Sequence, residues 1–447
     1  MNNQRRTVLE DKENARITSE SDSRSVAADL YPPSSVKRNF SWILAGNIIT
    51  QISMAGVLVA LAKFGSAAMQ GRFLLCLGIV NPIAVFLSLG LRALLITDSK
   101  EQFSFSDYLY LRIISCLFIV FICFLIGLYL VLRGSYGGDF LAVLSLVGGF
   151  KAAAFISDIC YAVFQKKQRM KYIGISRGIK ALGAFTITIA ILAVTGSLTA
   201  TMAGWVVVYC AMMLLYDLER VRRFYPEKGT FSLARSLAIS KQAIPLVAVA
   251  AILTLNTNIS RYVIAAYCGE AEVGYFGSMH YGVSAMSMVF VAIGHALLPK
   301  MVEDFKTRPL HIWRLAAKAT PVIIALGLTG FVVSLFLGRI ALTIFFSAEH
   351  ARYVHVLWIL MGGSVLVGMA SLMGFAGTAC RAFTVQAFAW AVIVCITLIG
   401  GIILVPRYGI MGAACVSIIS SCLAFISMAV IVAVYTWRRQ QQIALTV

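Results

Sequence analysis

Residues 107–132 read DYLYLRIISCLFIVFICFLIGLYLVL, a nearly unbroken run of apolar side chains. A helix of about 20 apolar residues spans the hydrocarbon core of a bilayer, which is roughly 30 Å thick. Inside lipid every backbone amide must find its hydrogen bond within its own segment, so the run predicts a transmembrane helix. A membrane β-barrel would instead show alternating segments of about 10 residues, a pattern that the sequence lacks.

Comparable runs recur on both sides of this one, and they predict an all-α, polytopic membrane protein with about a dozen spans. Of the 447 residues, 60% are hydrophobic and 13% are charged, whereas a soluble domain carries about 25% charged residues. The expected spans are 40–62, 74–97, 107–132, 140–164, 173–195, 200–218, 242–268, 276–298, 316–337, 353–378, 385–405 and 411–436.

The connecting loops predict the orientation of the chain. Lys and Arg gather in the loops at 165–171, 219–241 and 299–315, whereas the alternate loops hold only scattered cations. Cytoplasmic loops of membrane proteins carry the excess of basic residues, so we expect both termini to lie in the cytoplasm. The same bias accounts for the net charge of +19, and nucleic acid is not an expected partner.

The chain also contains two related halves. The segment FGSAAMQGRF at 64–73 matches YCGEAEVGYF at 267–276, and the same offset pairs Arg92 with His295. An offset of six spans keeps the membrane orientation, so the repeat is parallel, as in secondary transporters whose lobes rock around a central substrate. We expect a disordered cytoplasmic tail, a six-helix lobe, a basic cytoplasmic linker, a second six-helix lobe and a short cytoplasmic tail, at 1–37, 38–220, 221–241, 242–437 and 438–447.

Several motifs make the chain similar to a known family. The segments NISRY at 258–262 and CGEAEVGYF at 268–276 resemble the seventh-helix region of bacterial polysaccharide flippases, as does ALLP at 296–299 before a basic connector. The turn LVPRYGIMGAA at 404–414 is also typical of these proteins. They belong to the multidrug/oligosaccharidyl-lipid/polysaccharide exporter superfamily, and the resemblance extends from about residue 38 onward.

The resemblance implies translocation of an undecaprenyl-diphosphate-linked oligosaccharide from the cytoplasmic to the periplasmic leaflet by alternating access, for lipopolysaccharide, exopolysaccharide or capsule. Membrane lipid, a polysaccharide polymerase and assembly proteins are the further partners to be considered. Many relatives carry an acidic residue in the seventh helix, where this chain has Asn256, Asn258 and Arg261, so no cation site is expected there. No cofactor or metal is expected either, because the ten cysteines form no C-x-x-C pair.

Charged residues inside the spans are the candidate binding groups, because a charge deep in a bilayer usually faces a cavity or a partner. Lys151 shares a helix face with Asp158, either as a cavity lysine that meets the anionic head group or as half of a structural pair. Arg177 could snorkel to the interface, and so could Arg261. The expected cationic cleft consists of Lys151, Lys180, Arg261 and Arg177, with weaker polar candidates at Gln51, Asn256, Asn258, Asp158 and His280.

Two other functions stay open at this point. A cation-coupled multidrug or metabolite exporter of the same superfamily has the same architecture, but usually a carboxylate-lined cavity. A membrane polysaccharide polymerase or ligase belongs to a different class and generally needs a sizeable periplasmic loop, whereas the outer loops expected here are short. The sequence also lacks a loop with paired carboxylates for acid–base catalysis and a nucleophile beside a base, so we do not expect an enzyme.

Overall fold

The computed structural model describes residues 36–97, 103–224 and 233–446, and all regular structure in these ranges is helical. The first lobe contains α2 (Val36–Phe64), α3 (Ala67–Leu87), α4 (Leu91–Thr97), α5 (Phe105–Leu132), α6 (Gly138–Lys166), α7 (Met170–Thr195), α8 (Leu198–Met212), the π-helical turn η1 (Met213–Leu218) and α9 (Glu219–Arg222). The second lobe contains α10 (Leu233–Tyr267), α11 (Glu270–Thr307), α12 (His311–Ala341), the π-helical turn η2 (Leu342–Phe346), α13 (Ala348–Arg352), α14 (Val354–Ala379) and α15 (Phe383–Thr446).

Ten helical stretches of the described residues are long and apolar enough to cross a membrane. The stretch at 383–443 holds two of the expected spans, because Gly409 has φ 58° and ψ −139° and breaks the helix there. Helix α10 covers the expected span 242–268 except for its last residue, and each remaining expected span overlaps one of the other stretches. The predicted all-α, polytopic fold is therefore confirmed.

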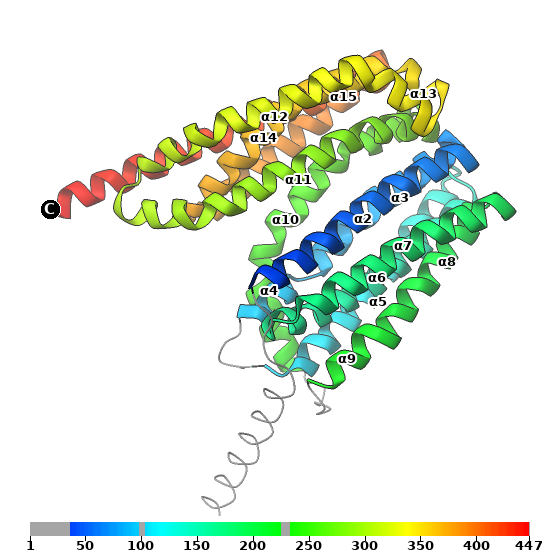
Figure 1. Cartoon of the computed structure of the whole chain (residues 1–447), viewed down its shortest axis with the longest axis horizontal. Helices are drawn as coiled ribbons and strands as arrows, with labels where there is room; N and C mark the ends of the chain where they lie inside the picture. Colours follow the sequence, from blue (N-terminus) through cyan, green and yellow to red (C-terminus); the bar gives the residue numbers. More distant parts are fainter. Residues whose placement is uncertain (1–35, 98–102, 225–232, 447) are drawn as a thin grey trace, which may run out of the picture.

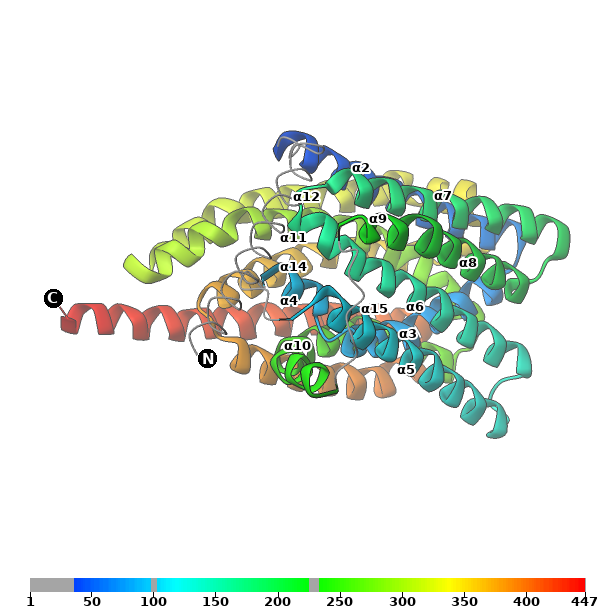
Figure 2. The same cartoon turned by 90° about the horizontal axis from the view of Figure 1, so that it is seen from below.

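The regions outside the spans are only partly described. Residues 1–35, most of the expected tail at 1–37, lie outside the described residues, as do 225–232 within the expected basic linker. The expected tail at 438–447 continues α15 as a helix to Thr446, and the last turns of α15 project beyond the other helices (Figures 1 and 2).

The two halves begin and end their first helices at matching positions. Helix α2 ends at Phe64 and α3 begins at Ala67, while α10 ends and α11 begins 203 residues later in both cases. The residues before α3 and α11 are Ser66, whose hydroxyl accepts the Met69 N–H at 3.1 Å, and Gly269, whose φ is 94°. Ser is a favoured N-cap, and glycine adopts a positive φ without strain. The structure thus repeats the offset found in the sequence.

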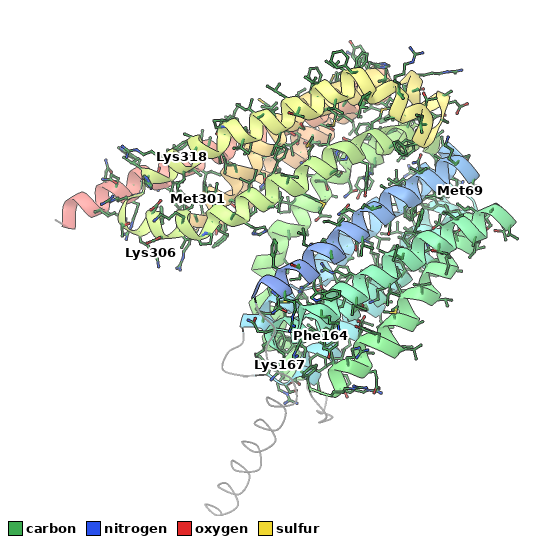
Figure 3. The ribbon with its side chains drawn as sticks, viewed as in Figure 1. Met69, Phe164, Lys167, Met301, Lys306 and Lys318 are labelled. Atoms are coloured by element: carbon green, nitrogen blue, oxygen red, sulfur yellow. The ribbon has the colours of Figure 1, made fainter. Side chains whose placement is uncertain are left out.

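The helices form two groups that converge at one end and diverge at the other (Figure 1). Lys167 of the first lobe and Lys306 and Lys318 of the second lie at the diverging end (Figure 3), which we call the basic end. We call the other end, with α13, the joined end. At the joined end one hydrophobic core continues through both lobes, from Phe73 to Phe276. Toward the basic end each lobe has a core of its own, around Phe164 in the first and Met301 in the second.

Helix α10 connects the two groups at the basic end as well. Ile239, in its first half, packs into the core of the first lobe near the basic end. Arg235 pairs with Asp107 of α5 at 3.1 Å. The second half of α10 packs along α15 and α3, so this one helix contacts both lobes over its length.

Candidate functional site

Polar contacts connect the two lobes at the joined end. Arg72 on α3 grips the carboxylate of Glu270 on α11 through Nε and Nη2, at 3.0 and 2.8 Å. Tyr281 on α11 donates a hydrogen bond to the backbone oxygen of Gln51 on α2 at 2.7 Å. Because bidentate arginine–carboxylate pairs are strong and directional, these contacts favour closure of this end.

A buried histidine adds to this closure. The His350 residue is 1% exposed, and its Nε2 lies 3.1 Å from Oε1 of Gln70 in the other lobe. Gln70 in turn donates to Ser278 of α11 at 2.9 Å, and Nδ1 of His350 lies 2.8 Å from the Ser347 hydroxyl. Burial lowers the pKa of His350 to about 4, although nearby Glu349 partly offsets that shift. The neutral ring fits this network, with Nε2–H donating to Gln70 and Nδ1 accepting from Ser347.

Two glycines at equivalent positions of the repeat let α3 and α11 cross at very short range. A Cβ atom on Gly71 would overlap the backbone oxygen of Glu270, and one on Gly274 would overlap that of Ala67. Ala67 and Glu270 are the first residues of α3 and α11, so each glycine meets the first turn of the other helix. Small residues commonly allow such close approach of membrane helices. The reciprocal contact has the form of an approximate two-fold interface between the lobes.

Three arginines of the first lobe gather around Asp158 of α6. Arg92 on α4 pairs with Asp158 at 2.7 Å, and both side chains are about a quarter exposed. Arg177 on α7 and Arg112 on α5 lie within electrostatic range of the same carboxylate. We call these four residues the arginine cluster. Three guanidinium groups against one carboxylate leave a surplus of positive charge in the part of the lobe near the basic end.

Arg177 and Arg112 are held inside the lobe. Arg177 donates to Asn47 of α2 at 2.7 Å and lies 5.5 Å from the centre of the Tyr161 ring. Arg112 is fully buried and lies 5.5 Å from the centre of the Phe155 ring. The contact with α2 fixes the direction of the Arg177 side chain, in place of the snorkelling considered from the sequence.

Lys151 is a half-buried cation with few contacts. Its ammonium group lies 5.8 Å from the centre of the adjacent Phe150 ring. Asp158 pairs with Arg92, so the structure does not form the Lys151–Asp158 pair that the sequence left open. No carboxylate of the described residues lies within salt-bridge distance of Lys151.

Lys180 has quite different surroundings from those expected. It is 3% exposed, its ammonium group lies 2.6 Å from Asp217, and it also donates to the Ser157 hydroxyl. The π-helical turn η1 carries Asp217, and such turns re-aim side chains within a helix. The structure thus places Lys180 in a buried ion pair inside the first lobe, whereas it was expected to face a cleft.

In the second lobe, Arg261 is the candidate cation. It is half-buried on α10, donates to Asn258 at 2.8 Å, and packs beside Gly78 of α3 in the other lobe. His280 on α11 lies within range of its charge. As with Lys151, the described part of the chain places no carboxylate within salt-bridge distance of Arg261. This charge therefore lies unneutralised at the contact between the lobes.

The weaker polar candidates mostly connect helices. Gln51 accepts a hydrogen bond from Tyr281 across the lobes, Asn258 holds Arg261, and Asn256 donates to Ser420 of α15 at 3.2 Å. Such amide contacts commonly join membrane helices. The structure thus divides the candidates into helix contacts and the cations Lys151, Arg261 and the arginine cluster.

The cations lie at different depths in the molecule. At a helical rise of about 1.5 Å per residue, Asp158 is about 12 Å and Lys151 about 22 Å from the basic end of α6. Arg261 lies only about 9 Å from the joined end of α10 by the same measure. No group of His, Cys, Asp or Glu among the described residues could hold a metal ion. The arrangement suits an anionic ligand, because phosphate groups are bound by Arg and Lys.

The sequence analysis overlooked several of these residues. Asp217 lies at the end of the expected span 200–218 and is the only carboxylate within it, which was a usable signal. Arg92 and Arg112 each lie near the end of an expected span, where a basic side chain usually reaches toward the interface, so neither was placed in the expected cleft. His350, Arg72 and Glu270 lie within the first two turns of α13, α3 and α11, and one sequence gives no sign that these positions meet across the lobes.

Comparison with known proteins places this geometry in context. The family model described as "Polysaccharide biosynthesis protein" matches residues 36–304. The Capsular polysaccharide biosynthesis protein CapF of Staphylococcus aureus is 25% identical over 397 residues, which cover 87% of this chain and 97% of that protein.

Solved structures share the fold. The lipid II flippase MurJ in an inward closed conformation superposes with a TM-score of 0.72 at 14% identity, over 87% of this chain and 86% of that one. An inward-facing MATE multidrug transporter of the MOP superfamily superposes with a TM-score of 0.63 at 12% identity, over 88% of this chain and 95% of that one.

Proposed function

We infer the function from one premise, that this chain belongs to the polysaccharide biosynthesis protein family. We propose that it is a transporter, not an enzyme, and that it moves an undecaprenyl-diphosphate-linked oligosaccharide from the cytoplasmic to the periplasmic leaflet. The names of CapF and MurJ, a capsule biosynthesis protein and a lipid II flippase, agree with this proposal.

The observation that carries the proposal is the set of half-buried cations without carboxylate partners. Lys151 and Arg261 lie within helices that cross the predicted membrane, where an unpaired charge is costly. A diphosphate that passed between the lobes would supply the missing negative charge to each in turn. The arginine cluster, with its surplus positive charge, would receive the head group first, followed by Lys151 and then Arg261.

Alternating access follows from the way in which the lobes meet. We propose that the basic end faces the cytoplasm, since basic residues remain on that side, and that the joined end faces the periplasm. The structure would then be the state that receives substrate from the cytoplasm. Separation of α3 from α11, with closure at the basic end, would release the substrate on the other side.

The test uses a deletion strain that is complemented with variants. We expect complete undecaprenyl-diphosphate-linked units to accumulate on the cytoplasmic face, shielded in spheroplasts from a membrane-impermeant oxidising label, while surface polymer disappears. The wild-type gene should restore polymer, and Lys151→Met or Arg261→Met should restore it poorly at equal protein levels.

Other outcomes would overturn the proposal. If units in the deletion strain reach the periplasmic face but stay unpolymerised, the protein is a polymerase or ligase. If polymer is unchanged and the strain becomes sensitive to cationic drugs, the protein is a drug exporter.

A further inference from the structure

The second lobe contains a cavity of about 890 Å³. It lies between two helix pairs, because α10 packs along α15 and α11 packs along α14. Thr257 on α10, Val291 on α11 and Phe383 at the start of α15 line the cavity and are exposed, so the cavity is open to the surface. Ligand sites in proteins usually measure roughly 300–1,000 Å³, and this cavity has the size of such a site.

The walls are mainly apolar. Aromatic side chains line the part near the basic end, where α14 ends and α15 begins; they are Phe290, Phe375, Phe383 and Trp390. None of the described residues that line the cavity is Asp, Glu, Lys or Arg. A diphosphate would therefore find no countercharge in the cavity, whereas an uncharged hydrocarbon would gain contact with the aromatic and aliphatic walls.

Most polar side chains of the wall bond to one another or to the backbone of their own helix, whereas the buried Oδ1 atom of Asn256 has no hydrogen-bond partner among the described residues. Asn256 and Thr397 both donate to the Ser420 hydroxyl, at 3.2 and 3.0 Å, and Ser260 lies 3.3 Å from Ser417. These bonds join α10 to the second half of α15, and that half to the first. A sugar would need many hydrogen bonds from the wall, whereas an uncharged hydrocarbon needs none, so the mainly apolar wall is better matched to a ligand with little hydrogen-bonding demand.

Small side chains keep the space open. A Cβ atom on Gly374 of α14, which lines the cavity, would meet no atom within 4 Å. By contrast, a Cβ atom on Gly368 or Gly377 of the same helix would collide with a neighbouring side chain. Protein interiors are close-packed, so an open space of this size, bordered by a glycine that could hold a larger residue, indicates a place for a ligand.

We propose that this cavity binds the uncharged polyprenyl chain of the lipid carrier, an inference that rests on the proposed function. The chain is hydrocarbon along its whole length, which matches the walls. Ser260 in the wall adjoins Arg261, and His280 lines the cavity within range of that charge. A chain in the cavity would therefore leave its diphosphate beside Arg261, outside the apolar space.

The test uses the full chain in nanodiscs and a polyprenol that carries a benzophenone group but no head group. Irradiation should cross-link the probe to peptides of α11 and α14 that line the cavity. Gly374→Leu, which fills the cavity, should reduce this cross-linking by about tenfold. The matched control is Thr329→Leu, which adds a similar side chain at an exposed position of α12 and should cross-link like the wild type. If Gly374→Leu fails to fold, Ser371→Leu, also in the wall, replaces it.

Competition distinguishes the source of the chain. Unlabelled polyprenol should displace the probe, whereas phospholipid in the same excess should not; equal displacement by phospholipid would overturn the proposal, as would cross-links outside the cavity. Arg261→Met should leave polyprenol cross-linking unchanged while weakening that of polyprenyl diphosphate. If polyprenol cross-links in the cavity but the deletion strain still flips its lipid-linked units, the binding site stands and the proposed function fails.

Discussion

Lys151 and Lys180 lie in neighbouring helices but have different surroundings. We therefore expect replacement by methionine to affect protein stability at one position and transport at the other. Lys180→Met would leave the Asp217 carboxylate, which is 0% exposed, without its partner. Breaking a buried ion pair costs about 3–5 kcal/mol, so the purified variant should unfold at a clearly lower temperature. Lys151→Met removes a charge that has no carboxylate partner in the described structure, and it should keep near wild-type stability while impairing complementation.

A double variant separates the pair from general damage to the helix. Adding Asp217→Leu to Lys180→Met should recover much of the lost stability, because both charges are then gone. Equal thermal stability of wild type and Lys180→Met would contradict the buried pair. Normal complementation by Lys151→Met would remove Lys151 from the proposed path of the head group.

His350 predicts a pH dependence of stability. Its pKa is about 4 in the folded protein and about 6.5 in an unfolded chain, so between these values the unfolded chain binds more protons. Stability should therefore be fully present above pH 6.5 and should fall as the pH drops toward 4. The measurement is the thermal unfolding of wild type and His350→Gln at pH 7.5 and 5.

In that comparison the decrease between the two pH values should be smaller for His350→Gln. Both proteins keep the groups around position 350. These include Glu349, which opposes the lowering of the His350 pKa, and Tyr275, whose ring centre is 4.8 Å from that of His350. His355→Gln is the matched control and should keep the wild-type decrease. A decrease in His350→Gln as large as that of the wild type would show that other groups carry the pH dependence.

At the residue scale the sequence could place charges on a helix face but could not choose their partners. Helix α6 is continuous over Gly138–Lys166, so the seven-residue spacing, about two turns, puts Lys151 and Asp158 on the same side of it. The partner of Asp158 is Arg92, which comes from α4. Which helices become neighbours depends on packing between distant segments, and helical periodicity carries no information about it.

At the scale of elements, the crossing of α3 and α11 can be tested with a single methyl group. Gly71→Ala should force the two helices apart, because its Cβ would overlap the backbone of α11. Position 278 is buried at this crossing. A cysteine introduced there by Ser278→Cys should react faster with a membrane-impermeant maleimide in the protein that carries Gly71→Ala than in the protein that keeps Gly71.

The control for this experiment is Gly362→Ala on α14. Its Cβ would have ordinary contact with Phe331 at 3.5 Å, so labelling at position 278 should not change. Peptide-resolved mass spectrometry separates this site from the ten native cysteines. Unchanged labelling in Gly71→Ala would show that the two helices do not need this close approach.

The elements were also the part that the sequence predicted best. The apolar runs predicted the helices. The spacing between the repeated segments at 64–73 and 267–276 is also the spacing between the ends of α2 and α10. The course of α10 was not foreseen: Ile239 packs in the first lobe, although the span that follows belongs to the second. That contact, too, involves segments far apart in the sequence.

At the scale of the whole molecule, the continuity of the hydrophobic core explains the shape. A single core at the joined end and separate cores toward the basic end allow the lobes to tilt with little loss of contact inside either lobe. The repeat in the sequence indicated two lobes, but not which end is closed. That choice depends on contacts such as Arg72–Glu270, which must break and re-form as the lobes move.

The proposed direction of transport predicts a response to membrane potential. A diphosphate head group carries negative charge outward, and a potential of 100 mV, inside negative, is worth about 2.3 kcal/mol for each charge that crosses. In proteoliposomes loaded with lipid-linked oligosaccharide from the deletion strain, a potassium diffusion potential should shift the leaflet distribution toward the positive side by roughly 50-fold per charge. The Lys151→Met/Arg261→Met double variant should show no transport at either potential. If wild-type transport does not change with the potential, positive charge must cross the membrane together with the head group and cancel its negative charge. That positive charge would belong either to moving side chains of the protein or to a co-transported ion.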